Sequence, residues 1–263
     1  MIMPRRAFIC LCWMLGACPV FAVSDNALRV AAASNFMPVA VQLRELFCEG
    51  RGSDCKDQIV FTFASSGKLY SQIIHGAPYH IFMSADVEKP VRLIEDGFAE
   101  ASSLHVYAKG KLVFASRNVL EFQSESFVKK LVNAKVAVAN PKLAPYGQAS
   151  IEALEHFSGF DREQVKLVYG ENIAQVFHMF ISGAVEFAFL SASQVLLSPE
   201  GQEPTIYYWP LPNNYHSAIE QALVLLNSHG QHKNRAENTL AKAFVTFLSS
   251  DAATAKIRQS GYD

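Results

Sequence analysis

The chain has 263 residues, of which 50% are hydrophobic, 18% charged and 11% aromatic. This composition excludes a disordered chain, a collagen and a coiled coil, and the length suits two α/β lobes or one large domain with a buried core. The formal net charge is -1, and Lys and Arg are spread along the chain without forming a basic stripe. A nucleic-acid partner is therefore not expected.

The N-terminus has the features of an export signal. Arg5 and Arg6 are followed by an uncharged run over residues 7–24, and residues 20–22 (Val-Phe-Ala) fit a cleavage site. We therefore expect residues 1–22 to be a signal peptide that is absent from the mature protein. Its removal leaves more acidic than basic side chains, so any anion that the protein binds must be held by local groups.

Two other interpretations of this segment remain. The uncharged run is nearly long enough for an N-terminal membrane anchor, although Gly16 and Pro19 interrupt it. The sequence Leu15-Gly16-Ala17-Cys18 resembles the lipobox of bacterial lipoproteins, in which the cysteine carries a lipid. A lipid anchor at Cys18 is therefore an alternative to a free mature chain.

Cleavage after residue 22 leaves two cysteines in the mature chain, Cys48 and Cys55. In the oxidising compartment that an export signal implies, two cysteines seven positions apart are expected to form a disulfide that closes a short loop. Two reduced thiols are the alternative, whereas a zinc site would need more ligands.

From residue 27 onward, short apolar runs alternate with helical patterns, which is typical of βα units around a mostly parallel sheet. The expected fold class is therefore α/β. The expected strands are 28–32, 59–63, 79–83, 112–115, 135–139, 165–168, 185–190 and 221–226. The stretch 204–214 contains three prolines and is expected to be a connection that leads to the last strand.

Cap-like polar residues follow several of these strands. Ser34 or Asn35 is expected to cap the helix after the first strand, and Ser66 lies at the start of the helix after the second. Similar starts precede expected helices at 87–96, 148–157 and 173–182. Since helix N-termini present unpaired N–H groups, these starts indicate either an anion site beyond the carboxyl ends of the strands or ordinary helix capping.

Motifs of the common enzyme classes are missing from the sequence. It contains no G-x-S-x-G, no G-x-x-x-x-G-K-[ST] and no H-E-x-x-H, and no nucleophile stands beside a base. Tyr207 and Tyr208 form a pair of the kind that ligates ferric iron in some exported binding proteins. An aromatic strand edge is the simpler interpretation of that pair.

Four segments of the chain have distinctive sequences. They are Val30-Ala-Ala-Ala-Ser34-Asn35, Phe63-Ala-Ser-Ser66-Gly67-Lys-Leu69, Gly76-Ala-Pro78 with Phe82-Met-Ser84-Ala-Asp86, and Ala139-Asn-Pro141 with Ala144-Pro-Tyr146-Gly147. In order and spacing, these segments resemble the periplasmic molybdate-binding proteins of ABC transporters. The resemblance extends from about residue 28 to the C-terminus.

The resemblance implies the two-lobed periplasmic-binding-protein fold of the second type. Each lobe would hold a mixed or mostly parallel sheet, with the ligand cleft between the lobes. The first lobe is expected to comprise residues 23–106 and 219–263, and the second residues 107–218. The chain is expected to cross between them near 106–109 and 215–221.

The resemblance also implies which residues hold a tetrahedral molybdate or tungstate anion. Ser34 and Ser66 would contribute hydroxyls and backbone N–H groups from the first lobe, where Asn35 matches relatives with asparagine at that position. Tyr146 and Ile173 would contribute backbone N–H groups from the second lobe. All of these donors are uncharged.

One segment departs from the family pattern. Some relatives place a tyrosine hydroxyl on the anion from a turn whose counterpart here is Phe189-Leu190-Ser191-Ala192-Ser193. That contact is expected to be absent or replaced, either by Ser191 or through compensation by Tyr146 or Asn35.

The expected function is binding without catalysis. The resemblance implies a periplasmic protein, expected to be a monomer with no cofactor, that captures molybdate or tungstate and delivers it to the membrane permease of an ABC transporter. The alternatives are a carrier for sulfate, or for ferric iron through Tyr207 and Tyr208. An effector domain of a transcription regulator would need a helix-turn-helix before residue 28, where the leader lies, and an enzyme would need a nucleophile–base pair.

Overall fold

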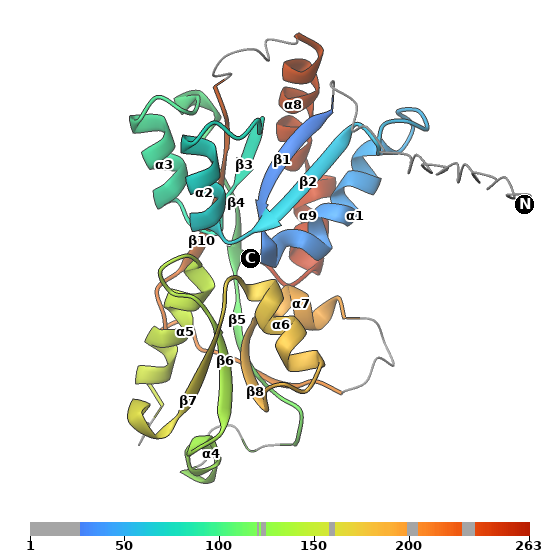
Figure 1. The fold of residues 1–263 in the computed structure, drawn as a ribbon. Helices are drawn as coiled ribbons and strands as arrows, with labels where there is room; N and C mark the ends of the chain where they lie inside the picture. Colours follow the sequence, from blue (N-terminus) through green and yellow to red (C-terminus); the bar gives the residue numbers. More distant parts are fainter. Residues whose placement is uncertain (1–26, 120, 122–124, 158–160, 199–204, 228–234) are drawn as a thin grey trace, which may run out of the picture.

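The computed structural model describes residues 27–119, 121, 125–157, 161–198, 205–227 and 235–263. It consists of two α/β units, one above the other in Figure 1, and each is built around a five-stranded mixed sheet. The expected two-lobed α/β fold is therefore confirmed. The expected signal peptide, residues 1–22, and Cys18 lie outside the described residues.

The first sheet has the strand order β2-β1-β3-β10-β4. Its strands are β1 (Leu28–Ala33), β2 (Ile59–Ala64), β3 (Ile81–Met83), β4 (His105–Gly110) and β10 (Ile219–Leu225). β1 runs parallel to both of its neighbours, and β10 runs antiparallel to β3 and β4. Nearly all of β1 is buried because helices cover both faces of this sheet, as its sequence, apolar except for Arg29, predicts.

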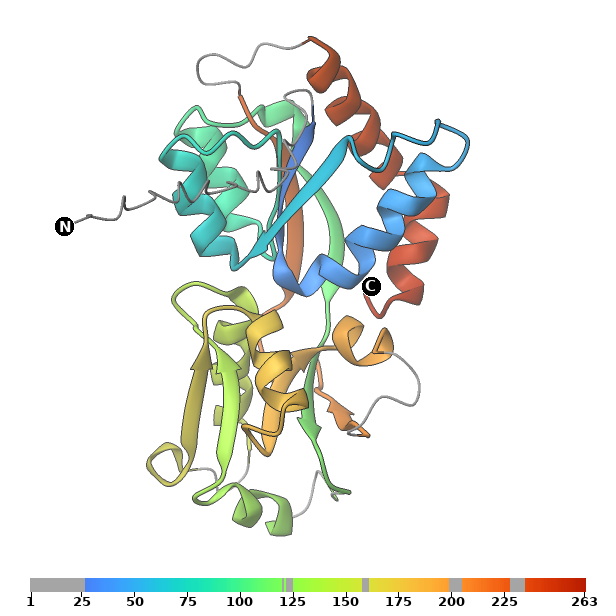
Figure 2. The same cartoon turned by 45° about the vertical axis from the view of Figure 1, so that its right-hand side comes forward.

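The helices of this unit form two groups, which lie on opposite sides of the sheet in Figures 1 and 2. One group is α2 (Ser66–Ile74) and α3 (Glu88–Glu95), and the other is α1 (Met37–Cys48), α8 (Arg235–Leu248) and α9 (Asp251–Gln259). Two short 3-10 helices, η1 (Ser34–Phe36) and η2 (Ala101–Ser103), complete the unit. None of the helices in the described part of the chain is long and apolar enough to cross a membrane.

The second sheet has the strand order β7-β6-β8-β5-β9. Its strands are β5 (Leu112–Ser116), β6 (Lys135–Ala139), β7 (Lys166–Gly170), β8 (Phe187–Ser191) and β9 (Tyr207–Pro210). Its helices are α4 (Glu125–Leu131), α5 (Pro145–Glu155), α6 (Ile173–Ile181), α7 (Ala192–Leu196) and the 3-10 helix η3 (Arg162–Gln164). A cluster of rings around Phe114 fills the core of this unit.

Two strands differ from the sequence-based expectations. The segment 105–110, where a crossing was expected, forms β4 and pairs with β10, so that Lys111 alone separates it from β5 in the other sheet. The segment 207–210 forms β9, so the prediction of a connection throughout 204–214 was wrong. Proline is tolerated in an edge strand such as β9, and for that reason the three prolines were misleading. The expected limits of the lobes stay a prediction.

A disulfide joins Cys48 to Cys55, as the sequence predicts, with their Cα atoms 5.6 Å apart. It closes the loop that follows α1, where the Arg51 guanidinium lies 4.2 Å from the centre of the Phe47 ring. The helix α1 has 12 residues and therefore spans roughly 18 Å. The disulfide is thus separated by the length of α1 from Ser34, which lies before the other end of that helix.

This separation predicts that the disulfide stabilises the fold without affecting ligand binding. The double variant Cys48→Ser Cys55→Ser is expected to fold and to lose at most about 2–3 kcal/mol of unfolding free energy, because the closed loop is short. Thermal unfolding and calorimetric titration of the variant measure the two effects separately. A folded double variant that no longer binds the ligand would place the loop in the site and contradict this prediction.

Candidate functional site

Two helix starts lie side by side at one edge of the first sheet. β1 and β2 are parallel and end together, with Ala33 opposite Ala64. Ser34 follows β1 directly in η1, and Ser66 is the first residue of α2 after β2. The sequence therefore brings both serines to the same edge by way of strand register.

The second sheet repeats this arrangement. β6 and β7 are parallel and also end together, with Ala139 opposite Gly170. Tyr146 is the second residue of α5, which follows β6, and Ile173 is the first residue of α6, which follows β7. Each sheet thus directs two helix N-termini beyond the carboxyl ends of its strands.

The two edges face each other and are in contact. The N–H of Gly67 in α2 donates to the carbonyl oxygen of Leu143, just before α5, at 2.9 Å. On the other side of the junction, η1 packs against α6. The helix starts around Ser34, Ser66, Tyr146 and Ile173 therefore converge on the junction between the two units, as Figures 1 and 2 also show.

The backbone N–H groups at these starts lie at the beginning of helices. Ser66 and Ile173 are the first residues of α2 and α6, and Tyr146 is the second of α5, so their N–H groups have no acceptor within their own helix. The first N–H groups of any helix lack an intrahelical partner, and their dipoles make the region electropositive. Donors of this kind from four chain segments can hold an anion without a charged side chain.

The serine side chains do not act as helix caps, contrary to the sequence-based expectation. The N-cap residue of α1 is Phe36 and that of α2 is Ser65, and neither helix has a side-chain cap hydrogen bond. The chain does use side-chain caps elsewhere: Asn172 Oδ1 accepts from the N–H of Gln175 at 3.0 Å. The helix starts at both serines, like those of α3 and α5, are therefore uncapped.

The hydroxyl of Ser66 is oriented by the protein. Its Oγ accepts a hydrogen bond from the N–H of Ala85 at 2.9 Å, which leaves its own proton free to be donated. The hydroxyl of Ser34 makes no hydrogen bond within the described part of the chain, although only 4% of the residue is exposed. Ser65 Oγ is also buried without a partner. Three hydroxyls that can donate thus gather at this edge.

The side-chain amide nitrogen of Asn35 is held by the protein. Its Nδ2 donates to Gln221 Oε1 at 2.9 Å and to the Tyr262 hydroxyl at 3.1 Å. The backbone carbonyl oxygen of Asn35 accepts from Ser193 Oγ at 3.1 Å and from the Tyr262 hydroxyl at 3.0 Å. Because both amide protons are used, Asn35 can offer an anion only its backbone N–H.

This network joins the two units. Gln221 Oε1 accepts from the hydroxyl of Tyr107 at 3.0 Å, and Gln221 Nε2 donates to the hydroxyl of Tyr146 at 3.4 Å. Burial raises the pKa of Tyr262 to about 12 and those of Tyr107 and Tyr146 well above the ordinary value. The three hydroxyls therefore stay protonated and uncharged at neutral pH.

Ser191 has a structural role. Its side chain caps α7 and forms a capping box with Gln194, and its Oγ lies 3.0 Å from Ser193 Oγ. This hydroxyl is fully buried and bonded, so helix capping accounts for it. The hydroxyl of Ser191 is therefore not free to take the place of a tyrosine contact on a ligand.

The tyrosine pair lies in an edge strand. Tyr207 and Tyr208 are neighbours in the edge strand β9, and successive side chains of a strand point to opposite faces. Within the described residues, no group of three or more His, Cys, Asp and Glu side chains could hold a metal ion. Both tyrosines thus lie on an aromatic strand edge, with their side chains on opposite faces of it.

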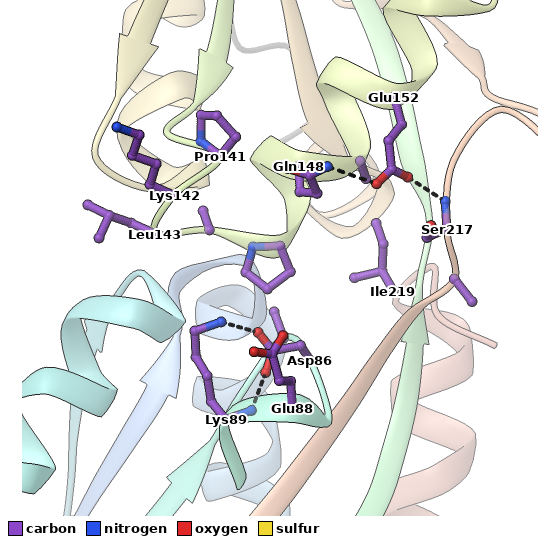
Figure 3. A pocket seen from close by; sticks show the side chains of 15 residues that line it. Asp86, Glu88, Lys89, Pro141, Lys142, Leu143, Gln148, Glu152, Ser217 and Ile219 are labelled. Atoms are coloured by element: carbon purple, nitrogen blue, oxygen red, sulfur yellow. Dashed lines mark hydrogen bonds and ion pairs between the residues drawn. The ribbon is translucent and has the colours of Figure 1, made fainter. Parts of the chain in front are cut away.

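A cavity of about 490 Å³ adjoins these helix starts between the two units (Figure 3). Asp86 is paired with Lys89 at 2.6 Å on one wall, and Glu152 accepts from the N–H of Ser217 at 2.7 Å on the other. Partial burial acts to raise the pKa of Glu152, but the hydrogen bonds that it accepts outweigh burial and lower the pKa. Three carboxylates, with Glu88, line this cavity, so it is less suited to an anion than the helix starts, whose N–H and hydroxyl donors are uncharged.

The two-lobed fold with facing helix N-termini is the architecture of an extracellular binding protein. The chain belongs to the bacterial extracellular solute-binding proteins, whose family model matches residues 28–263. Within that group it belongs with the ModA proteins. It is 34% identical to molybdate-binding protein ModA of Rhodobacter capsulatus over 232 residues, which are 88% of this chain and 86% of the relative.

Two further comparisons agree with this family and confirm the resemblance seen in the sequence. Molybdate-binding protein ModA of Azotobacter vinelandii is 32% identical over 236 residues, which are 89% of each chain. The solved structure of the periplasmic molybdate-binding protein of Azotobacter vinelandii matches with a TM-score of 0.76 and 29% identity. That match covers 90% of this chain and 98% of the other.

Proposed function

We propose that this protein captures molybdate or tungstate between its two lobes and delivers the anion to the permease of an ABC transporter. The observation that supports this function is the convergence of four helix starts, two from each sheet, at one junction together with the buried serine hydroxyls. Membership of the ModA family supports the identity of the anion. The protein acts without a cofactor and without catalysis, as a periplasmic monomer.

The chemistry of the donors fits this class of ligand. Molybdate and tungstate are fully deprotonated dianions at neutral pH, so their oxygens only accept hydrogen bonds. The proposed set of donors contains no carboxylate that could act as an acceptor. Monohydrogen phosphate carries a proton that would need an acceptor, and it is therefore disfavoured. Sulfate lacks a proton, so it must be rejected by the size of the closed site.

We assign the donors as follows. Ser34 and Ser66 contribute both a hydroxyl and a backbone N–H, whereas Asn35, Tyr146 and Ile173 contribute backbone N–H groups. Ser34, Asn35 and Ser66 follow strands of the first sheet, whereas Tyr146 and Ile173 follow strands of the second. Closure of the lobes brings the two sets together around the anion.

A thermal-shift panel on the mature protein tests this proposal. Molybdate and tungstate are expected to raise the melting temperature, because a ligand bound only by the native state adds about 4 kcal/mol at 1,000 times its Kd. Phosphate is expected to have no effect. An equal shift with sulfate would identify a sulfate carrier, and a shift with ferric citrate alone would move the site to Tyr207 and Tyr208.

The affinity is expected to depend little on pH. None of the proposed donors titrates near neutrality, and burial keeps the tyrosines of the adjoining network protonated. Calorimetric titration should therefore give a Kd that changes by less than about two-fold between about pH 6 and 8, where histidine changes its charge. A steep change near the ordinary pKa of histidine would show that a titrating group holds the anion.

A further inference from the structure

An ion pair crosses the junction beside the candidate anion site. Lys68 Nζ lies 3.0 Å from both carboxylate oxygens of Glu171. Lys68 belongs to the first turn of α2, two positions after Ser66, and Glu171 precedes Ile173 by two positions. The pair therefore connects the two helix starts that supply proposed donors from opposite lobes.

The backbone around Glu171 is held in place by its own unit. The N–H of Glu171 donates to Gln175 Oε1 at 2.6 Å, and Asn172 caps α6 by accepting from the N–H of Gln175. Glu171 is thus fixed close to the start of α6. A carboxylate at this position would repel a dianion bound at the N–H of Ile173 unless a cation neutralises it.

We propose that the Lys68–Glu171 pair is a latch that closes over the bound anion, and that Lys68 also masks the negative charge of Glu171. This inference rests on the proposed function. The latch forms only when the lobes are closed, since its partners lie on different lobes. It therefore slows release of the anion, while the masking effect keeps the carboxylate from slowing capture.

The two roles predict different effects for the two partners. Lys68→Met removes the latch and unmasks Glu171, so we expect release to become about two- to five-fold faster and capture to become slower. Glu171→Gln removes the latch but leaves the lysine cation, so release becomes faster while capture is unchanged or faster. The double variant Lys68→Met Glu171→Gln is expected to capture at the wild-type rate and to release faster.

The experiment is stopped-flow mixing of the mature protein with tungstate, at low and high salt, which gives both rate constants. The matched control is the ion pair between Lys56 and Glu45, which lies within the first unit, beside the disulfide loop. Its side chains are 50% and 43% exposed, against 47% and 40% for Lys68 and Glu171. Lys56→Met and Glu45→Gln make the same changes in net charge and are expected to leave both rates unchanged.

The outcomes separate this inference from the proposed function. If wild-type protein binds tungstate but the Lys68 and Glu171 variants release it at the rate of the controls, the latch is wrong and the proposed function stands. If both single variants change capture in the same direction, the masking role is wrong. If wild-type protein fails to bind tungstate, the proposed function is wrong and the latch is overturned with it.

Discussion

Replacement of Ser34 and Ser66 together by alanine is expected to reduce the affinity for molybdate by about a hundred- to ten-thousand-fold. Each hydroxyl is proposed to donate a charge-assisted hydrogen bond to the anion, which contributes roughly 1.5–3 kcal/mol. Each single variant is therefore expected to bind about ten- to a hundred-fold more weakly. Calorimetric titration of the two single variants and the double variant measures these losses.

The stability of the ligand-free variants distinguishes a loss of contacts from a loss of folding. Ser34 makes no side-chain hydrogen bond in the described residues, so Ser34→Ala should leave the melting temperature nearly unchanged. Ser66→Ala leaves the buried N–H of Ala85 without a partner, which costs about 1–3 kcal/mol. The protein should still fold, because this loss is smaller than the stability of a typical domain.

Ser65 provides a matched control at the same helix start. Its hydroxyl is buried and has no partner, so Ser65→Ala removes no hydrogen bond that the structure contains. We expect this variant to bind molybdate normally. Wild-type affinity in the Ser34→Ala Ser66→Ala double variant would contradict the assignment, and a loss confined to Ser65→Ala would transfer the hydroxyl contact to that residue.

The main elements of the fold could be predicted because their signals are local. Apolar runs bounded by polar residues predicted eight of the strands, and the register of parallel strands then placed Ser34 beside Ser66. In contrast, the local sequence does not decide whether a polar side chain at a helix start caps that helix. Asn172 caps its helix whereas Ser34 and Ser66 do not, and the sequence pattern is similar in all three cases.

The network that holds Asn35 could not be predicted from sequence, because its partners are distant in the chain. Asn35 is 186 positions from Gln221 and 227 positions from Tyr262. The one local signal is Gln221, a polar residue that is completely buried within the apolar strand β10. A buried amide needs partners, but which side chains supply them depends on how the strands and the C-terminus fold together.

Substitution of Gly67 is expected to have the second large effect on molybdate affinity. It tests closure of the lobes separately from the side-chain contacts of the anion. A Cβ atom on Gly67 would lie 3.0 Å from the carbonyl oxygen of Leu143 and 3.1 Å from its Cα atom, both in the other lobe. The lobes would have to separate by a few tenths of an ångström to admit it. The donors of Ser66 and Tyr146 lie next to this contact and would separate with it.

Gly67→Ala is therefore expected to weaken molybdate binding by about ten-fold or more, since anion hydrogen bonds of 1.5–3 kcal/mol each lose their geometry. In the ligand-free protein with the lobes apart, the new methyl group meets no backbone, and alanine favours the helix over glycine by about 0.5–1 kcal/mol. The melting temperature without ligand should thus stay the same or rise while the affinity falls.

Ser71→Ala, at an exposed position of the same helix, changes helix propensity alone and should leave the affinity unchanged. Wild-type affinity in a folded Gly67→Ala protein would show that this contact between the lobes does not control closure.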